Sequence, residues 1–208
     1  MESLDDTPLM HLFTVPFMSY RWPDVDDLNL ELRERILARE QVSPGQHRTN
    51  VGGWQSTEDF HKWTGEAGEK LVDLITELAN HATSHLFAYY KTQDELKWGM
   101  ALWANVNRAG QYNNTHIHPG ATWSGVYYAD TGSPVPEQPH SGDITFLSPI
   151  LPQTYSFFTK ALPSQYTIKP EAGRMVLFPS YLQHQVHPYW GEQPRISVAF
   201  NIKKDPFP

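Results

Sequence analysis

The spacing of apolar residues along the chain changes near residue 95. Before this point the spacing follows the period of a helix. Residues 24–40 carry apolar side chains near one helical face, and residues 66–86 carry the strongest pattern of this kind. We therefore expect residues 1–95 to form a mainly helical segment that packs against the rest of the protein.

After residue 95 the apolar runs shorten to the length of strands and are bounded by glycine and proline. We expect strands near residues 98–107, 122–129, 143–147, 154–159, 165–169, 174–178 and 195–202. Several short strands after a helical segment predict a barrel or sandwich with helices packed outside it. The chain is therefore predicted to be one mainly β domain, residues 1–208, whose β core is residues 96–208. The proline-rich run at 131–142 is predicted to be an exposed loop, although such loops can also cover active sites.

The composition limits the chemistry that the chain can perform. It has no cysteine, so thiol catalysis, thiolate metal sites and disulfides are excluded, whereas its ten histidines allow metal sites of another kind. The net charge of −7 disfavours a partner such as duplex nucleic acid. The first 17 residues lack the pattern of a secretory signal, and no apolar run approaches the length of a membrane span. We expect a cytoplasmic protein with no membrane partner.

Two histidines, His116 and His118, stand one residue apart just before a run that favours strand. If this segment is extended, both imidazoles leave the same face of the strand. Two neutral imidazoles in this arrangement can bind one metal ion. A third ligand would come from a distant strand, and His184 follows the predicted strand at 174–178. His187 is its nearest rival, but we favour His184.

The last predicted strand begins with Arg195, and alternation places Arg195 and Ser197 on one face and apolar residues on the other. An arginine and a serine on an interior face need an anionic partner. The guanidinium can bind a carboxylate through two hydrogen bonds, and the serine hydroxyl can add a third. This face of the strand therefore predicts a carboxylate-binding site.

The order H-x-H, distal His and R-x-S resembles the iron(II)- and 2-oxoglutarate-dependent dioxygenases. The phrases "VGGWQS", "GRMVLFPSYLQHQVHP" and "PRISVAFNI" look like an uncharacterised bacterial and phage-type branch near the prolyl hydroxylases. The resemblance covers nearly the whole chain and is firmest over residues 105–202. It implies a double-stranded β-helix, a jelly-roll or cupin-like barrel flanked by helices. It also implies the cofactors Fe(II) and 2-oxoglutarate, and hydroxylation of a substrate with release of succinate and CO2.

The resemblance assigns roles to individual residues. It implies that His116, His118 and His184 bind iron, and that Arg195 and Ser197 hold the distal carboxylate of 2-oxoglutarate. Further cosubstrate contacts are expected from Asn105, which stands eleven residues before the first metal histidine as in the alkyl-repair members, and from Asn107 and Tyr127.

One position departs from the family pattern, because His118 stands where the family carries a carboxylate. Three neutral ligands leave the metal centre more positive, which the 2-oxoglutarate dianion would offset. Octahedral iron remains compatible with this set, and zinc becomes a stronger alternative. Asp130 or Asp143 could instead complete the site.

Two other functions are open at this stage: a metal-binding cupin of other activity, and a barrel that binds a ligand without chemistry. The glutamate that a cupin carries soon after H-x-H is missing, and a cupin gives no reason for Arg195 and Ser197 on an inner face. The substrate, a small molecule or a peptide, is not specified by the sequence. The N-terminal helices could shape its entrance or form a homodimer contact.

Overall fold

The computed structural model describes residues 14–90, 97–150 and 163–204. The strand expected near residues 154–159 lies outside these ranges, and so does most of the N-terminal stretch considered as a secretory signal.

Two helices lie in the part of the chain where the helical period is found, α1 (Asp26–Val42) and α2 (His61–Tyr90). The first begins at Asp26 because Asp24 has a φ of 52°, outside the range of a right-handed helix. The second contains a kink at Gly65, whose φ of 56° is easily adopted only by glycine. Within the described ranges, neither helix combines the length and apolar character needed to cross a membrane.

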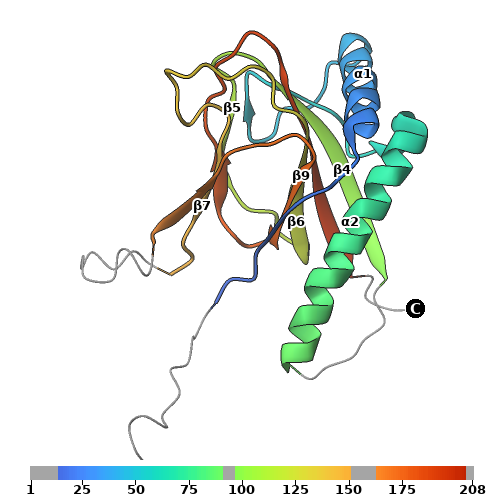
Figure 1. Cartoon of the computed structure of the whole chain (residues 1–208), viewed down its shortest axis with the longest axis vertical. Coiled ribbons are helices and arrows are strands. Elements are labelled where there is room, and N and C mark those ends of the chain that lie inside the picture. The colour runs from blue at the N-terminus through green and yellow to red at the C-terminus, as the bar shows by residue number, and fades with distance from the viewer. Residues whose placement is uncertain (1–13, 91–96, 151–162, 205–208) are drawn as a thin grey trace, which may run out of the picture.

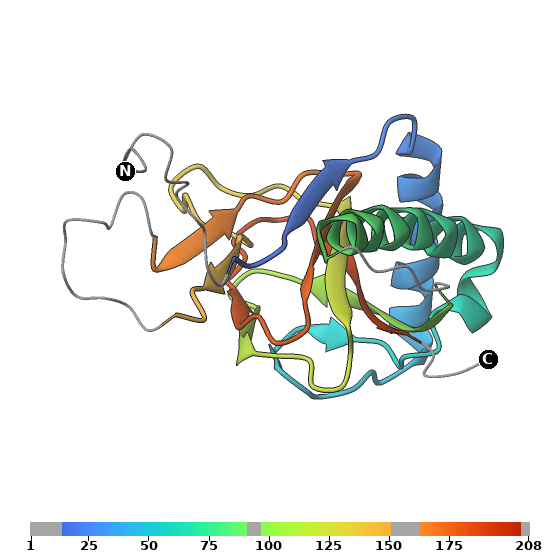
Figure 2. The same cartoon turned by 90° about the horizontal axis from the view of Figure 1, so that it is seen from below.

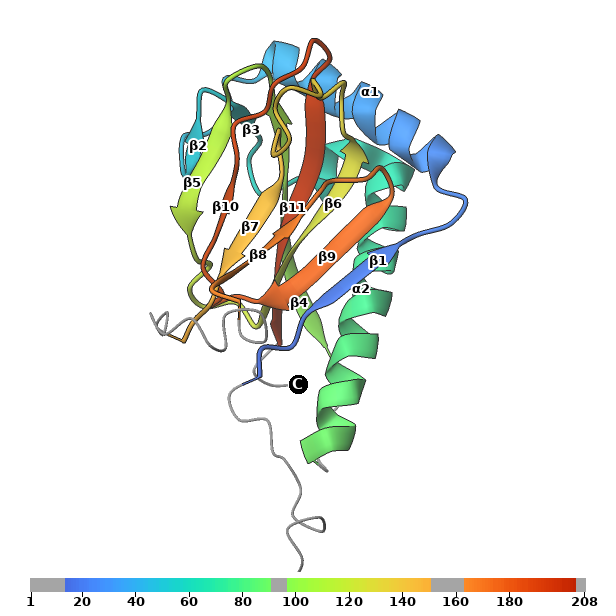
Figure 3. The ribbon, with the colours of Figure 1, turned by 60° about the vertical axis from the view of Figure 1, so that its left-hand side comes forward.

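The described strands form two antiparallel sheets, so the prediction of a mainly β chain is confirmed. The larger sheet has the order β1-β9-β6-β11-β4-β3, with bounds Met18–Arg21, Arg174–Pro179, Trp123–Asp130, Arg195–Lys204, Trp98–Asn107 and Trp54–Gln55. The smaller sheet has the order β2-β5-β10-β7-β8, with bounds Asn50–Val51, Tyr112–His116, His184–Val186, Ile144–Leu147 and Gln165–Ile168. Figure 3 shows the smaller sheet in front of the larger one.

The longest pairing in the larger sheet joins β11 to β4 over ten residues, from Arg195 opposite Asn107 to Lys204 opposite Trp98. The apolar face of β11 belongs to the main hydrophobic core, where Ile196 and Val198 are fully buried. The opposite face carries Arg195 and Ser197 toward a cavity. The predicted alternation of this strand is therefore confirmed.

Both helices cover the same face of the larger sheet, as Figures 1 and 2 show from two directions. Their apolar stripes and the outward side chains of β4, β6, β9 and β11 form one core, in which Leu32, Ile36, Leu71 and Ile75 are fully buried. Burial of this apolar area is the main source of stability for the helical segment. The other face of the sheet is left for the site.

Several short strands were not predicted, namely β1, β2, β3, β5 and β10. All five have between two and five residues with mixed burial, too few to show a period. Residues 131–142 form turns and irregular backbone, with one bridge from Pro134 to Gly191, as predicted for a loop.

Candidate functional site

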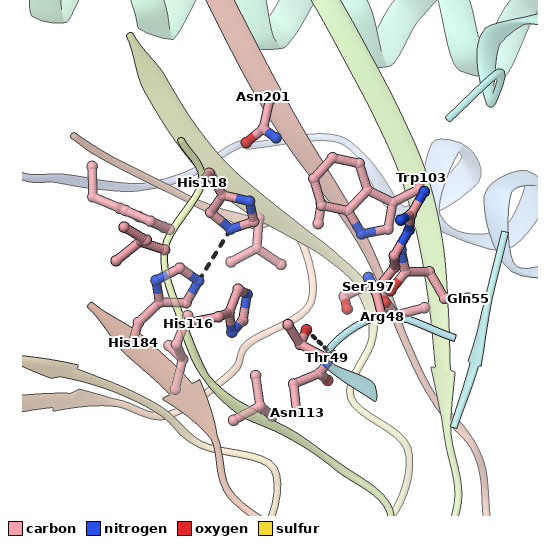
Figure 4. A pocket seen from close by; sticks show the side chains of 18 of the residues that line it. Arg48, Thr49, Gln55, Trp103, Asn113, His116, His118, His184, Ser197 and Asn201 are labelled. Carbon is pink, nitrogen blue, oxygen red and sulfur yellow. Dashed lines mark hydrogen bonds between the residues drawn. The ribbon is translucent and has the colours of Figure 1, made fainter. Parts of the chain in front are cut away.

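Three histidines from neighbouring strands meet at one point. His116 ends β5, His118 follows two residues later, and His184 begins β10 directly opposite His116. One ring nitrogen from each of the three lies within 4.8 Å of the others. Figure 4 shows the three rings turned toward one another. The structure therefore brings together the three histidines that the sequence singles out.

Backbone carbonyls fix the tautomers of two of these rings. The Nδ1 atom of His116 lies 2.6 Å from the carbonyl oxygen of Asn114, and Nδ1 of His184 lies 2.9 Å from that of Leu182. Each Nδ1 must therefore carry the proton and donate it, which leaves Nε2 with a free lone pair. The Nε2 atoms of His118 and His184 are 3.3 Å apart. Such an arrangement suits three imidazoles that share one cation.

Burial keeps these imidazoles neutral. Desolvation lowers the pKa of His184 to about 3 and that of His118 to about 4, and it also lowers the pKa of His116. A neutral imidazole is the form that binds a metal, so protons compete weakly for this site at neutral pH.

The rival ligands lie elsewhere. His187 Nε2 is 2.8 Å from the hydroxyl of Thr145, and the carboxylate of Asp130 accepts a hydrogen bond from Arg33 at 2.8 Å. Asp143 lies 3.1 Å from Nδ1 of His140. Among the described residues, the cluster of possible metal ligands contains none of them.

A cavity of about 220 Å³ lies beside the histidines and is lined by residues of both sheets. Its lining includes the three histidines, Arg195 and Ser197, so the two predicted halves of the site share one space. The Trp103 indole lines the same cavity, and the centre of its ring lies 5.8 Å from that of the His118 ring.

Arg195 is a buried cation with 2% of its surface exposed. Its Nη1 donates to Asn107 Oδ1 at 3.4 Å and to Ser197 Oγ at 3.3 Å, and its guanidinium lies 5.1 Å from the centre of the Tyr128 ring. Burial lowers its pKa, yet a guanidinium remains charged in proteins. The buried Nε atom has no hydrogen-bond partner among the described residues. This cation therefore retains donor capacity for an anion.

The two predicted asparagines lie on the side of β4 that faces the cavity. Asn105 lines the cavity and is opposite Ser197 on β11, and Asn107 accepts a hydrogen bond from Arg195. Both amides are buried, so they act as fixed polar groups beside the arginine.

The expectation for Tyr127 is wrong. Its side chain points to the helical face of the sheet, where its hydroxyl donates to Asn29 Oδ1 of α1 at 2.6 Å. The next residue, Tyr128, lines the cavity instead. The Tyr128 hydroxyl is buried and has no hydrogen-bond partner in the described chain. Burial raises its pKa, so it stays protonated as a donor.

Other residues of the cavity were not singled out by the sequence. Arg48, Thr49, Gln55 and Glu58 reach it from the segment between the two helices. The phrase "VGGWQS" lies in this segment, and its resemblance to the phage-type branch was the one available signal.

Comparison with known families places a match on the β part of the chain. The family described as "Putative 2OG-Fe(II) oxygenase" matches residues 101–201. This range contains the three histidines, Arg195 and Ser197. No curated protein sequence matches the chain.

Solved structures share the fold at low sequence identity. A prolyl-4-hydroxylase from Pseudomonas putida is 19% identical, with a TM-score of 0.67, over 93% of this chain and 95% of that chain. A prolyl hydroxylase from Trichoplax adhaerens, in complex with a peptide of hypoxia inducible factor, is 14% identical, with a TM-score of 0.61, over 91% of this chain and 84% of that chain. HygX from Streptomyces hygroscopicus, with nickel and 2-oxoglutarate bound, is 13% identical, with a TM-score of 0.57, over 93% and 85%.

Proposed function

We propose that this protein is a 2-oxoglutarate- and Fe(II)-dependent dioxygenase that hydroxylates a small-molecule or peptide substrate, since the family of 2OG-Fe(II) oxygenases matches residues 101–201. The observation that carries the proposal is the placement of three histidines and a buried arginine around one cavity. A divalent metal and a dicarboxylate in this cavity would each meet the residue types that bind them.

In this proposal His116, His118 and His184 hold Fe(II) through their Nε2 atoms. The backbone carbonyls behind His116 and His184 orient the rings and raise the basicity of the coordinating nitrogens. With His118 in the place of the usual carboxylate, the protein adds no negative charge to the metal. The charge of the cosubstrate then balances that of the ion.

The distal carboxylate of 2-oxoglutarate binds at the arginine end of the cavity. Arg195 and Ser197 donate to it, and Tyr128 replaces Tyr127 as the tyrosine donor. Asn107 holds the guanidinium in place, and Asn105 lies beside the path from the arginine to the histidines. The unpartnered Arg195 Nε and Tyr128 hydroxyl support this assignment, because buried donors without a partner are rare.

When bound, Fe(II) and 2-oxoglutarate supply the oxidising chemistry, with succinate and CO2 as coproducts. The chain positions the reactants and excludes water from the reacting atoms. Val126, Ile144 and Phe178 line the cavity with apolar surface for this purpose. The two sheets form the double-stranded β-helix, and α1 and α2 pack on its outside within the same domain.

Anaerobic titration of the Fe(II)-loaded protein with 2-oxoglutarate tests the function. A weak visible charge-transfer band should develop and saturate as the cosubstrate chelates the metal. If metal binds but no band forms, the cupin alternative replaces this proposal. If neither metal nor cosubstrate binds, the barrel is a ligand-binding protein without this chemistry.

Tyr128→Phe is expected to weaken 2-oxoglutarate binding by about tenfold or more, because a hydrogen bond to a charged group is lost in a buried site. Tyr127→Phe is the matched control. It removes the bond to Asn29 and should lower the free energy of unfolding by about 1–3 kcal/mol, with the cosubstrate affinity unchanged. Calorimetric titration and chemical denaturation of both variants measure the two effects. Equal affinity of the two variants for 2-oxoglutarate would show that Tyr128 does not bind the cosubstrate.

A further inference from the structure

Two charged side chains at the opening of the cavity lack partners. Of the described residues that line the cavity, the charged ones are Arg48, Glu58 and Arg195. Arg195 is buried and hydrogen-bonded, whereas Arg48 and Glu58 are exposed. Within the described residues, neither exposed side chain has a hydrogen-bond or ion-pair partner, and the two are not paired with each other. The opening therefore offers one cation and one anion.

The backbone that carries Arg48 is held in place by hydrogen bonds. The Arg48 amide donates to the side chain of Asn50, which in turn donates to the carbonyls of Gln46 and Gly53 at 3.2 and 2.6 Å. The carbonyl of Thr49 accepts a hydrogen bond from the Asn114 amide, next to the strand end that carries His116. The turn that holds Arg48 is thus tied to the histidine strand.

The backbone around Glu58 is tied to the opposite sheet. The Ser56 amide donates to the Ala104 carbonyl at 2.9 Å, and the Ser56 hydroxyl accepts from the Ala104 amide at 2.9 Å. Asp59 forms a bridge with Leu102, also on β4. Both charges therefore stand on backbone fixed by the strands of the site, which is a property of built recognition sites.

Arg48 lines the cavity from the side opposite the metal ligands, and Glu58 also belongs to the cavity lining. Figure 4 shows Arg48, Thr49 and Gln55 across the cavity from the three histidines. A substrate bound by Arg48 would thus lie between this side chain and the metal. The cavity volume of about 220 Å³ is below the range of about 300–1,000 Å³ that is typical of sites for drug-sized ligands. Because the metal and 2-oxoglutarate occupy part of this cavity, the space that remains favours a small substrate.

Resting on the function proposed above, we propose that the substrate is a small zwitterion of the amino-acid type. Its carboxylate pairs with Arg48, and its ammonium group pairs with Glu58. A purely anionic substrate would bring its charge near Glu58 without a cation to offset it, and a purely cationic one would do the same at Arg48. A guanidinium can grip a carboxylate through two hydrogen bonds, which orients the rest of the molecule toward the metal.

The test measures binding without turnover. The Fe(II)-loaded protein with 2-oxoglutarate, kept anaerobic, is titrated calorimetrically with each of the standard amino acids. Each one that binds is then compared with its carboxamide and its N-acetyl derivative. We expect at least one amino acid to bind, and each derivative to bind about three- to tenfold more weakly, since the contacts are partly exposed to solvent.

Charge-neutral variants assign each contact. In Arg48→Gln the difference between acid and carboxamide should disappear, whereas the difference between amine and N-acetyl compound should remain. Glu58→Gln should show the reverse. Lys62→Gln and Glu77→Gln, which neutralise exposed charges on α2, serve as controls that keep both differences.

Two results would overturn the proposal: no amino acid binds to protein that binds 2-oxoglutarate normally, or the variants at Arg48 and Glu58 keep both differences. Absence of the 2-oxoglutarate charge-transfer band in the same samples of wild type would instead reject the proposed function on which this inference rests. The same samples therefore distinguish a failure of the substrate proposal from a failure of the proposed function.

Discussion

Replacing His184 with alanine is expected to abolish stoichiometric Fe(II) binding, with an affinity loss of more than about a hundredfold. Loss of an orienting partner behind a ligand already costs about 10–100-fold in affinity, and here the ligand itself is removed. His184 is buried between the strands, and its ring contacts Phe146 and Phe178. Metal content after anaerobic loading, together with calorimetry, measures the loss.

His187→Ala is the matched control for this variant, since His187 lies three residues further on and bonds to Thr145 instead of the cluster. It should retain metal at the level of wild type. Circular dichroism of both variants establishes that they are folded. Full iron content in His184→Ala would show that the ligand set is wrong, and loss of iron in His187→Ala alone would move the third ligand to that residue.

Arg195→Gln is expected to weaken 2-oxoglutarate binding by about a hundredfold or more, while Fe(II) still binds. Breaking a buried pair of charges is strongly destabilising, because the remaining charge is left without a partner. The charge-transfer band at a fixed 2-oxoglutarate concentration should therefore be much weaker than in wild type. Arg108→Gln removes an exposed arginine that pairs with Glu40 and should leave the band unchanged.

Arg195 is also a packing residue, since it lies against Tyr128 and Gly142. Ser197→Ala keeps this packing and removes only one hydroxyl donor, so it tests the same carboxylate site with less risk to folding. It should weaken 2-oxoglutarate binding by about tenfold. An Arg195→Gln protein that is folded and binds 2-oxoglutarate as wild type does would exclude the proposed carboxylate site.

The parts of the fold that were predictable are those in which burial differs between the two faces of a strand. On β11 the charged and polar residues Arg195 and Ser197 alternate with Ile196 and Val198, so each face could be assigned from the sequence. The helical segments were predictable for the same reason, because one face of each is apolar.

The strand β6 shows where this reasoning fails. Residues 123–129 are all buried, because one face meets the helices and the other meets the cavity. A strand buried on both sides lacks alternation, so the sequence does not say which of two adjacent tyrosines faces inward. The pairing of β6 with β11 decides which tyrosine faces the cavity, because Tyr128 lies opposite Ser197 and Tyr127 lies opposite Val198.

The residues at the rim of the cavity could not be predicted from the sequence for another reason. Arg48 and Glu58 belong to a segment between two helices, and its strands β2 and β3 have two residues each. Their approach to the histidines depends on hydrogen bonds with strands more than forty residues later in the sequence, such as that between Ser56 and Ala104. Local patterns carry no information on contacts of this range.

The division of β11 into two faces bears on how this protein can change during evolution. Substitutions at the cavity-facing positions 195, 197, 199 and 201 alter what is bound without touching the helical core. An insertion or deletion of one residue in this strand would exchange the two faces, placing Arg195 in the core and Ile196 in the cavity. New specificities on this scaffold should therefore arise by replacement of single residues and by lengthening of loops, while the length of β11 stays constant.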